Sequence, residues 1–569
     1  MLRAFQSTEP TRSHDLSALA TTMIMDVFLN PRQVSRLMKT TDFFPRVAIL
    51  VALLMLLGLL SSCSDDQQRG VAEPVLDVVE MTLGDVVSAL ENEEVSSTDL
   101  VRAYLARIDA MDRQGPALQA LIAINPDAMT LAAASDGRRA AGNPKSRLDG
   151  VPVLLKDNIE SMDAMATTAG STALIGNVTG RDSPLVASLR ASGAIILGKT
   201  NLSQWANYRS TNSVSGWSSV GGLVKNPHVL DRQACGSSSG SASATAASFA
   251  AASVGTETNG SIICPSQVNG VVGLKPTHGL LAIDHIVPIA ATQDTAGPIT
   301  KSVIGAALLL DGMTDWQYGF FDGLDATAIA GMRIGVMNFS LNSNPRLTAA
   351  FNDAVGTLED LGAELVAIDE FDRDEGYWAS SGIVMDAEFK AYITDYLAGS
   401  PADIPVRSLA ELVEFNQEHA AVEQAIFDQD IFESALDAPS LDSDAYQAAL
   451  ATVKTATREN GIDFLLRHYE VDVLVGPSGP VSPRVDVVNG DVWPAWAGAG
   501  SLAAVSGYPN LTVPMGDVAG VPVGISFMSG SGNDQLLLSV GLAFEQTTNA
   551  RLTPAYKPSV LADEMQLLD

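Results

Sequence analysis

The stretch from Ala234 to Gly273 constrains the fold of this chain more than any other. It reads ACGSSSGSASATAASFAAASVGTETNGSIICPSQVNGVVG, which is a serine and glycine loop, a run of small residues, and a second glycine and serine loop. Ala dominates the run Ser241 to Ser253 and is the best helix former, so we expect a helix here and not a flexible linker. A helix with so little apolar bulk favours close backbone approach to a neighbour, which would fix the separation of the two loops.

Apolar runs on both sides of this segment predict strands that alternate with helices. Expected strands cover Val151 to Leu155, Ala194 to Leu197, Val471 to Val475, Asn510 to Pro514 and Val523 to Phe527, with a helix at Pro184 to Arg190. Ser96, followed three residues later by Asp99, predicts the N-cap of another helix. This alternation is typical of a layered α/β sheet. A hydrophobic content of 46% with 18% charged residues is consistent with a large buried core.

Between about residues 345 and 465 the pattern changes to long helices with polar faces, rich in Glu, Asp and Ala, such as Arg407 to Phe427. We interpret this stretch as a helical cap inserted into one domain that covers residues 74–569. The strand-like runs near the C-terminus then rejoin the same sheet.

The N-terminal region carries the one apolar run that resembles a membrane signal. Val47 to Leu60 follows basic residues and ends in small residues before Cys63. Its fourteen residues are fewer than the roughly 20 that span a bilayer as a helix. A basic flank, a short apolar core and a small-residue site are the parts of a secretory signal peptide. Leu60, Ser61, Ser62 and Cys63 also resemble a bacterial lipoprotein cleavage box.

We therefore expect residues 1–63 to be a lipoprotein signal peptide, with Met38 as a possible true start. Cys63 would then carry the lipid, and the polar residues 64–73 would tether the domain to the membrane. This predicts an exported protein of the bacterial envelope, either periplasmic or tethered to the outer membrane. An uncleaved signal anchor is the alternative.

The chain is strongly acidic, with a formal net charge of −32 from 34 Lys and Arg against 66 Asp and Glu. Residues 1–63 hold six basic and four acidic residues, so removing them leaves 28 basic and 62 acidic residues and a charge of −34. Such acidity argues against a nucleic-acid partner, because phosphate binding needs a basic surface.

The two cysteines outside residues 1–63, Cys235 and Cys264, are too few for a disulfide scaffold. We expect packed thiols, with a single bridge between them as the alternative.

The serine loops indicate acyl-transfer chemistry. A serine becomes a useful nucleophile when a base takes its proton, and backbone N–H groups must face the oxyanion that develops. The loop Gly255 to Ser261 offers both a serine and such N–H groups. Gly260 permits backbone geometry that residues with a Cβ disfavour, so N–H groups around Ser261 can converge on one oxygen.

The first candidate base is a histidine. Gly236 to Gly240 matches the G-x-S-x-G nucleophile elbow, which would make Ser238 the nucleophile with His419 or His468 as its base. That elbow needs an apolar strand directly before it, whereas Asn226 to Gln233 is polar and contains a proline.

The second candidate base is Lys156, which ends the apolar run of V-P-V-L-L-K-D-N-I. Desolvation can lower the pKa of a lysine by up to ~3 to 5 units, which would make it a base near neutral pH. An exposed lysine at a strand end is the alternative, and so is a charged lysine paired with Asp157. No His, Cys or carboxylate cluster has metal-ligand spacing, and His278 and His285 are expected to be loop residues.

These motifs resemble the amidase signature family. The chain has C-G-S-S-S-G-S at Cys235 to Ser241, G-T-E-T-N-G-S-I at Gly255 to Ile262 and G-V-V-G-L-K-P-T at Gly270 to Thr277. Further matches are G-V-P-V-L-L-K-D-N at Gly150 to Asn158, L-G-K-T-N-L-S at Leu197 to Ser203, and G-Y-P-N-L-T-V-P-M-G at Gly507 to Gly516. The resemblance extends from about Met81 to Tyr556. It implies a mixed twisted sheet covered by helices on both faces, with an inserted helical cap.

The resemblance also implies roles for individual residues. Lys156 matches the catalytic lysine, Ser237 the bridging serine on a cis peptide bond, and Ser261 the nucleophile, 24 positions after Ser237. The backbone amides of Thr258, Asn259, Gly260 and Ser261 would bind the oxyanion, and Ser238 would support the two catalytic hydroxyls by hydrogen bonding. Neither a metal nor an organic cofactor is implied.

Two departures from the family pattern concern the same loop. Asn259 replaces the first glycine of the usual pair, so the backbone there must suit a side chain, although Asn tolerates left-handed geometry better than most residues. An arginine that often follows the serine in members with acidic substrates is absent, and Ile263 and Cys264 stand there instead. A free carboxylate beside the scissile bond is therefore disfavoured.

Within the family the chain most resembles the bacterial peptide amidases, which remove the C-terminal amide of peptides. The shared features include the stretch Thr292 to Pro298 and the sequence R-S-L-A-E-L-V-E-F-N at Arg407 to Asn416. We therefore expect a peptide or small-molecule amide as the partner, with ammonia as a product. The alternatives are a general aliphatic or aryl amidase, an esterase, or a non-catalytic envelope lipoprotein that binds amides.

Overall fold

The computed structural model describes residues 76–372 and 374–560. Its strands are β1 (Leu121–Ile124), β2 (Pro152–Lys156), β3 (Ile195–Thr200), β4 (Trp217–Ser218), β5 (Gly222–Leu223), β6 (Ala252–Glu257), β7 (Val272–Lys275), β8 (Thr295–Thr300), β9 (Arg333–Met337), β10 (Glu364–Ile368), β11 (Val473–Pro477), β12 (Asn510–Val518) and β13 (Val521–Met528).

The helices are α4 (Leu83–Glu91), α5 (Ser97–Met111), α6 (Ala128–Ala140), α7 (Pro184–Ala191), α8 (Ser239–Ala246), α9 (Ile263–Val268), α10 (Val303–Met313), α11 (Pro345–Asp360), α12 (Tyr377–Gly399), α13 (Leu409–Glu418), α14 (Ala420–Glu423), α15 (Asp430–Leu436), α16 (Asp444–Thr457), α17 (Asp463–His468), α18 (Gly500–Ser506) and α19 (Asp534–Thr548). Short 3₁₀ turns lie at Thr172–Leu174, Gln204–Asn207 and Asn338–Ser340, and a π turn lies at Arg458–Ile462.

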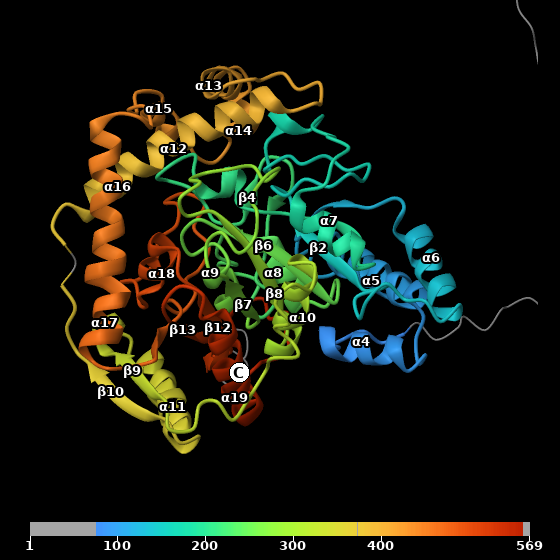
Figure 1. The fold of residues 1–569 in the computed structure, drawn as a ribbon. Helices are drawn as coiled ribbons and strands as arrows, with labels where there is room; N and C mark the ends of the chain where they lie inside the picture. Colours follow the sequence, from blue (N-terminus) through green and yellow to red (C-terminus); the bar gives the residue numbers. More distant parts are fainter. Residues whose placement is uncertain (1–75, 373, 561–569) are drawn as a thin grey trace, which may run out of the picture. The chain divides into compact units, whose positions relative to one another are not determined.

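In the described residues eleven strands form a mixed sheet in the order β1-β3-β2-β6-β8-β7-β12-β13-β11-β9-β10 (Figure 1). Strands β3, β2 and β6 run parallel, as do β11, β9 and β10, and the other neighbours are antiparallel. Every residue of β2, β3 and β6 is buried, which explains why the apolar runs of β2 and β3 are continuous and not alternating. The sheet centre is therefore shielded from water.

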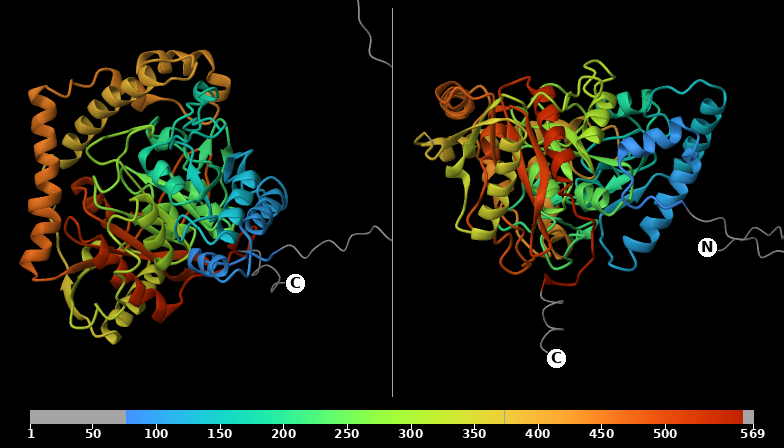
Figure 2. Two further views of the ribbon diagram at one scale, coloured as in Figure 1. Left: turned by 45° about the vertical axis from the view of Figure 1, so that its right-hand side comes forward. Right: turned by 90° about the horizontal axis from the view of Figure 1, so that it is seen from below.

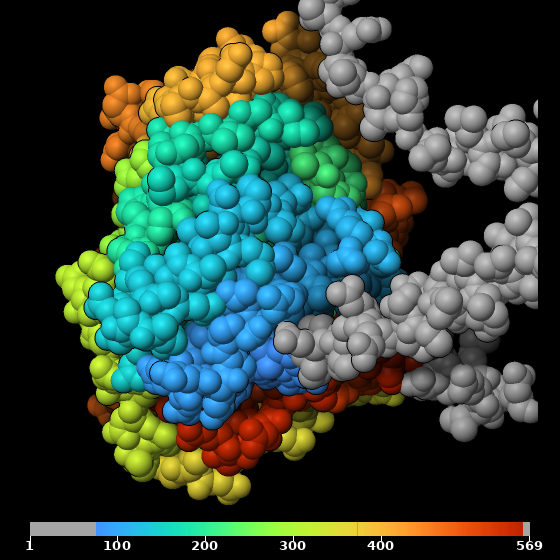
Figure 3. Space-filling view, turned by 90° about the vertical axis from the view of Figure 1, so that its right-hand side faces the viewer, coloured from blue at the N-terminus to red at the C-terminus, as the bar shows by residue number. Residues whose placement is uncertain are grey.

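Helices cover both faces of this sheet, as strand β8 shows. Ile299 packs against Ala242 and Ala246 of α8. The next residue, Thr300, points to the opposite face, where a Cβ on Gly305 of α10 would lie 3.2 Å from its Cβ. The α/β fold predicted from the sequence is confirmed. On the side seen in Figure 3, helices α4 to α7 supply much of the blue to cyan surface.

Most of the expected elements are present. The predicted strands correspond to β2, β3, β11, β12 and β13, and the predicted helix at Pro184 corresponds to α7. Ser96 caps α5 in a capping box with Asp99. The helix expected over Ser241 to Ser253 is shorter, because α8 ends at Ala246 and residues 252–257 pair between β2 and β8 instead. Strand pairing in the sheet centre thus overrides the helix propensity of Ala251 and Ala252.

The helical cap begins later than expected. Within the predicted stretch 345–465, α11 packs on β12 and α19, and β10 is the edge strand of the main sheet. The all-helical part starts at Tyr377 and runs through α12 to α17, seen in yellow to orange in Figure 2. The helix expected over Arg407 to Phe427 is divided into α13 and α14 at His419.

One buried carboxylate attaches this cap to the sheet domain. Glu423 accepts hydrogen bonds from Ser171, Ser219 and the Thr172 backbone N–H.

The expected signal peptide, tether and lipid-bearing Cys63 lie outside the described residues. In the part of the chain that the structure covers, no helix combines the length and apolar character needed to cross a bilayer.

The close approach predicted for the small-residue helix gives a test. A Cβ on Gly240 of α8 would lie 2.3 Å from the carbonyl oxygen of Asn201 and 2.4 Å from that of Ala120. We expect Gly240→Ala to lower the free energy of unfolding by about 1 to 3 kcal/mol, measured by chemical denaturation.

Gly137→Ala is the matched control for this test. Gly137 also lies in a helix, α6, but it is exposed and has no atom within 4 Å of a built Cβ. The free energy of unfolding of this control should rise by roughly 0.5 to 1 kcal/mol, which is the usual difference between Ala and Gly in a helix. If Gly240→Ala and Gly137→Ala had equal free energies of unfolding, the close packing of α8 at Gly240 would be contradicted.

Candidate functional site

The amine of Lys156 lies at the centre of the site, at the end of β2 and fully buried. Its Nζ is 2.8 Å from Ser237 Oγ, 2.8 Å from Thr256 Oγ1 and 3.2 Å from the Thr256 carbonyl oxygen. Asn158 holds the Thr256 hydroxyl from the other side, because its Nδ2 donates to Oγ1 at 3.0 Å. The alternative of an exposed strand-end lysine is therefore wrong.

Burial lowers the pKa of Lys156 to about 7, although the carboxylates of Asp294 and Glu257 act in the opposite direction. Asp157 does not pair with this amine. Its carboxylate faces Lys199, with 3.5 Å between Oδ1 and Nζ, and both side chains are fully buried. Because Asp157 is engaged by a second lysine, Lys156 has no ion-pair partner at hydrogen-bond distance among residues 76–372 and 374–560.

Ser237 lies in the first glycine and serine loop, and the Gly236–Ser237 peptide bond is cis, as the resemblance implies. The carbonyl of Ser237 accepts a hydrogen bond from the Ser203 backbone N–H at 3.1 Å. A Cβ on Gly236 would lie 2.1 Å from Ser203 Oγ, so that position requires glycine. These contacts fix Ser237 against the residues that follow β3.

Ser261 lies in the second loop and is 8% exposed. The two loops meet through the main chain, since the Ser238 N–H donates to the Ser261 carbonyl at 3.2 Å. Gly260 has a φ of +82°, a conformation that favours glycine. The backbone of Asn259 does not have a positive φ, so a side chain fits at this position without strain. This explains why Asn can replace the first glycine of the usual pair.

Two carboxylates organise the loop around Ser261. Glu257 Oε2 accepts the backbone N–H groups of Ile262 at 2.8 Å and Ile263 at 3.1 Å, and so caps the start of α9. Asp294 accepts the Thr258 hydroxyl at 2.5 Å. Desolvation raises the pKa of Asp294 to about 6, against the effect of its hydrogen bonds. Both carboxylates are therefore structural supports for residues 258–261.

Ser238 differs from expectation in its hydrogen bonds. Its Oγ donates to the Thr256 carbonyl at 3.0 Å and accepts the Thr256 N–H at 3.2 Å, so it contacts the backbone of β6 and not the hydroxyls of Ser237 and Ser261. As expected, no strand lies directly before it in the described chain, because residues 224–238 form a loop up to α8. The elbow interpretation lacks its strand.

The histidines required by the elbow interpretation are elsewhere. His419 stacks on Phe415 in the cap, and His468 stacks on Phe464 at the end of α17. His278 and His285 lie in the loop between β7 and β8, as expected. Lys156 is thus the candidate base that contacts one of the loop serines.

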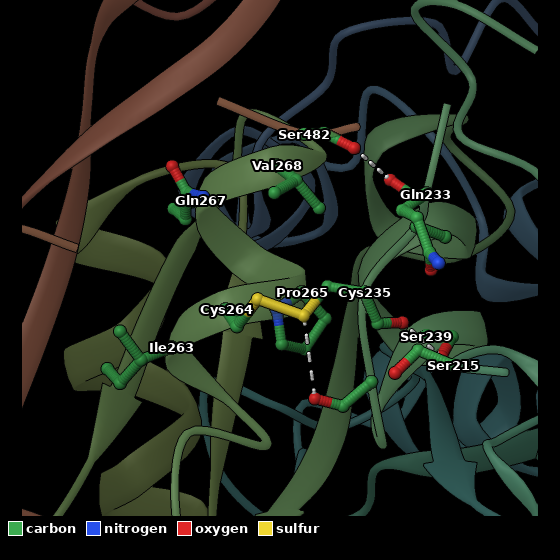
Figure 4. The surroundings of a disulfide bond; sticks show 12 residues. Ser215, Gln233, Cys235, Ser239, Ile263, Cys264, Pro265, Gln267, Val268 and Ser482 are labelled. Atoms are coloured by element: carbon green, nitrogen blue, oxygen red, sulfur yellow. Dashed lines mark hydrogen bonds between the residues drawn. A yellow bond between two sulfur atoms is a disulfide. The ribbon is translucent and has the colours of Figure 1, made fainter. Parts of the chain in front are cut away.

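Cys235 and Cys264 form a disulfide with 6.0 Å between their Cα atoms (Figure 4). The expectation of two packed thiols is wrong, and the alternative of a bridge is confirmed. Cys235 comes two residues before Ser237, and Cys264 comes three residues after Ser261 in α9. The bridge therefore connects the two serine loops directly.

A cleft of about 500 Å³ opens beside these loops. Its lining includes both cysteines of the disulfide and glycines of the two loops, together with Trp378, Trp493 and Trp496. Trp493 and Trp496 contact each other edge to face, with ring centroids 5.7 Å apart. Glu257 is the one charged residue among those lining the cleft, and its Oε2 is engaged by α9. The cleft thus combines tryptophan side chains with a set of polar residues, which are Ser215, Asn259, Ser478 and Ser501 besides Glu257.

Several residues of this site were not predicted from the sequence. Thr256 and Glu257 lie within the G-T-E-T motif, and Asp294 lies within the stretch Thr292 to Pro298, so the motifs held a usable signal. The tryptophans carried no signal in the sequence, because Trp378 and Trp496 come from segments about 120 residues apart.

Among the described residues no group of three His, Cys, Asp or Glu side chains is arranged to hold a metal ion.

Comparison with known proteins agrees with this geometry. A family model described as Amidase matches residues 99–538. A probable amidase of Arabidopsis thaliana is 35% identical over 90% of this chain and 98% of its own length. One glutamyl-tRNA(Gln) amidotransferase subunit, from Gloeobacter violaceus, is 31% identical over 84% of this chain and 99% of its own length.

Solved structures show the same relationship. The native peptide amidase of Stenotrophomonas maltophilia is 40% identical, with a TM-score of 0.78 over 84% of this chain and 99% of that one. A structure of peptide amidase with the competitive inhibitor chymostatin superposes with a TM-score of 0.79. An amidase family protein from Bacillus anthracis is 31% identical, with a TM-score of 0.74. This chain therefore belongs to the amidase signature family of hydrolases.

Proposed function

We propose that this amidase hydrolyses carboxamides with Ser261 as nucleophile, Ser237 as proton relay and Lys156 as base. The observation that carries the proposal is the 2.8 Å contact between Ser237 Oγ and the amine of Lys156, which is fully buried and whose pKa burial lowers to about 7. A lysine of this kind is neutral in a large fraction of molecules at neutral pH. It can therefore accept a proton.

The surroundings of the amine support this direction of proton transfer. A neutral amine has two N–H groups and one lone pair. If the N–H groups donate to the hydroxyl and carbonyl oxygens of Thr256, the lone pair faces Ser237 Oγ. Ser237 can then give its proton to Lys156 while it takes the proton of Ser261.

The loop before Ser261 supplies the electrostatic part of the reaction. As Ser261 attacks the carboxamide carbon, the N–H groups of Thr258, Asn259, Gly260 and Ser261 would stabilise the oxyanion, at roughly 3 kcal/mol per donor. Ser237 then protonates the departing ammonia, and water hydrolyses the acyl-enzyme by the reverse relay. Glu257 supports this role, because it engages the next two N–H groups and leaves the earlier ones for substrate.

The nucleophile assignment predicts that Ser261→Ala abolishes amide hydrolysis while the protein stays folded. Ammonia release measures the activity, and circular dichroism checks the fold. A serine-reactive fluorophosphonate probe should label the wild type and not the variant, because labelling needs the activated hydroxyl. The same probe excludes a purely amide-binding protein, which should not react.

Ser88→Ala is the matched control, since Ser88 lies exposed on α4. Full activity and labelling are expected for it. Retained turnover in Ser261→Ala would remove Ser261 from the mechanism.

The base assignment predicts the pH dependence. Because the pKa of Lys156 lies at about 7 and the neutral form is required, kcat/KM should fall as the pH decreases through 7 and should level off above it. Lys156→Arg keeps the charge but cannot accept the proton, so kcat should fall by at least ~100-fold.

Lys301→Arg is a matched control, because burial also lowers the pKa of Lys301 to about 7 but its amine contacts Ser248 and the Met81 carbonyl. In Lys301→Arg, kcat/KM should still fall as the pH decreases through 7. If Lys156→Arg keeps high activity and shows the same fall in kcat/KM, the assignment of Lys156 as the base is contradicted.

The substrate we propose is the C-terminal amide of peptides. Supporting observations are the tryptophans of the cleft, the absence of a basic side chain among the residues that line it, and the similarity to a peptide amidase. A cleft without a cation disfavours an acyl group with a free carboxylate near the scissile bond. General aliphatic or aryl amides and esters are the competing substrates within the family.

Kinetics over a panel of peptide amides, small amides and esters tests this substrate class. Trp496 is half exposed in the cleft, so Trp496→Ala should raise KM about 3- to 10-fold for peptide amides with an apolar C-terminal residue and leave acetamide hydrolysis unchanged. Tyr318→Ala, an equally exposed aromatic residue that does not line the cleft, is the control. Equal use of small amides and peptide amides by the wild type would favour a general amidase.

We also propose that the protein is exported and tethered through a lipid on Cys63. The Cys235–Cys264 bridge supports export independently of the N-terminal sequence, because disulfides persist mainly in oxidising compartments. N-terminal analysis of the mature protein should find a lipid-modified Cys63 as the first residue. Any residue retained before Cys63 would contradict the lipoprotein assignment.

A further inference from the structure

We propose that the Cys235–Cys264 disulfide positions the two catalytic loops, so that amide hydrolysis depends on its oxidised form. The proposal rests on the roles proposed above for Ser237 and Ser261. Its first support is the connectivity. The bridge spans 29 residues and joins the segment that ends in Ser237 to the helix that follows Ser261.

The backbone at Cys235 is the second support. Cys235 has a φ of +54°, a left-handed conformation that is unfavourable for a residue with a Cβ. Such a conformation persists where the surroundings determine it. The Ser239 hydroxyl donates to the Cys235 carbonyl, and the disulfide holds its side chain (Figure 4). Without the bridge, a covalent restraint on this conformation is lost, and Gly236 and Ser237 follow directly in the chain.

The other end of the bridge is equally close to the chemistry. Cys264 lies in the first turn of α9, and its N–H donates to the Gly260 carbonyl at 2.8 Å. Glu257 caps this helix, because its carboxylate accepts hydrogen bonds from the backbone N–H groups of Ile262 and Ile263. Between the two loops the main-chain contact is the 3.2 Å hydrogen bond from Ser238 to Ser261. The disulfide is the covalent restraint that complements it.

The bridge borders the substrate cleft. Both cysteines line this cleft, and they pack against Val268 and Trp493. Because Cys235 is only 5% and Cys264 only 3% exposed, a reductant would have to approach the bridge through the cleft. A substrate or inhibitor seated there should therefore cover the bridge.

The chemical step is thiol–disulfide exchange with a dithiol. The dithiol supplies two electrons and two protons, the Cys235–Cys264 bond breaks to give two thiols, and the reductant closes to its own disulfide. In this reduced form the loops would lose their covalent restraint. A misplacement of about 1 Å at a catalytic group can reduce turnover by ~100-fold.

The test compares oxidised and reduced protein at a temperature where both are folded by circular dichroism. Dithiothreitol should lower kcat by ~10- to 100-fold, with a smaller change in KM, and should slow labelling of Ser261 by the fluorophosphonate probe. Reoxidation should restore both. Chymostatin, added before the reductant, should slow the appearance of the two thiols.

The double variant Cys235→Ala/Cys264→Ala should show the same loss of kcat and should not respond to dithiothreitol. If this variant does not fold, the reduced wild type carries the test. Full kcat in the folded, reduced wild type would overturn the proposal, and so would a loss of activity that follows only the loss of the folded signal. Failure of the proposed function is recognised separately, as full activity of Ser261→Ala in the oxidised protein.

Discussion

The amine of Lys156, held out of water between Ser237 and Thr256, is the interaction on which the rest of this structure depends. An amine in water carries a proton and cannot act as a base at neutral pH. Here β2 lies between β3 and β6 in a sheet covered on both faces, so its last side chain has no access to solvent. Desolvation then lowers the pKa of Lys156, and the nearby Asp294 and Glu257 act in the opposite direction.

Such a site requires loops that approach the buried amine closely. The structure achieves this with small residues, because a Cβ on Gly236 would overlap Ser203, and a Cβ on Gly255 would lie 2.9 Å from Ser238 Oγ. Helix α8 consists entirely of buried Ser, Gly, Ala and Thr residues and packs between the two loops on the sheet. The unusual composition of residues 234–273 therefore reflects the close packing of the two loops around the buried amine. The disulfide adds a covalent restraint at the edge of this packed region.

Local patterns predicted much of the fold correctly. Continuous apolar runs located β2 and β3, because strands in a buried sheet need apolar residues on both faces, and strand-like runs located β12 and β13. The end of the small-residue helix and the start of the cap were placed wrongly. Ala251 and Ala252 favour a helix by themselves, and only pairing with β2 and β8 makes this stretch extended. Likewise β10 joins the sheet through its contact with β9, which no local pattern reveals.

The site was predictable where its residues lie in motifs. Lys156 contacts Ser237, and the Gly236–Ser237 peptide bond is cis, as the resemblance implied, whereas Ser238 supports β6 and Asp157 faces Lys199. Thr256 and Asp294 act on the site through hydrogen bonds whose partners are distant in sequence, and the tryptophans meet only in the folded chain. Spacing alone carries no information on such contacts.

The protonation state of Lys156 is the central claim, and it can be measured without turnover. Nuclear magnetic resonance of lysines labelled at the side-chain amine, with the Lys156 signal assigned by its absence in Lys156→Arg, reports the titration directly. Burial lowers the pKa of Lys275 to about 8 and that of Lys301 to about 7, so the assignment is essential. The account predicts that Lys156 titrates with a pKa of about 7. A value near that of an ordinary exposed lysine would contradict it.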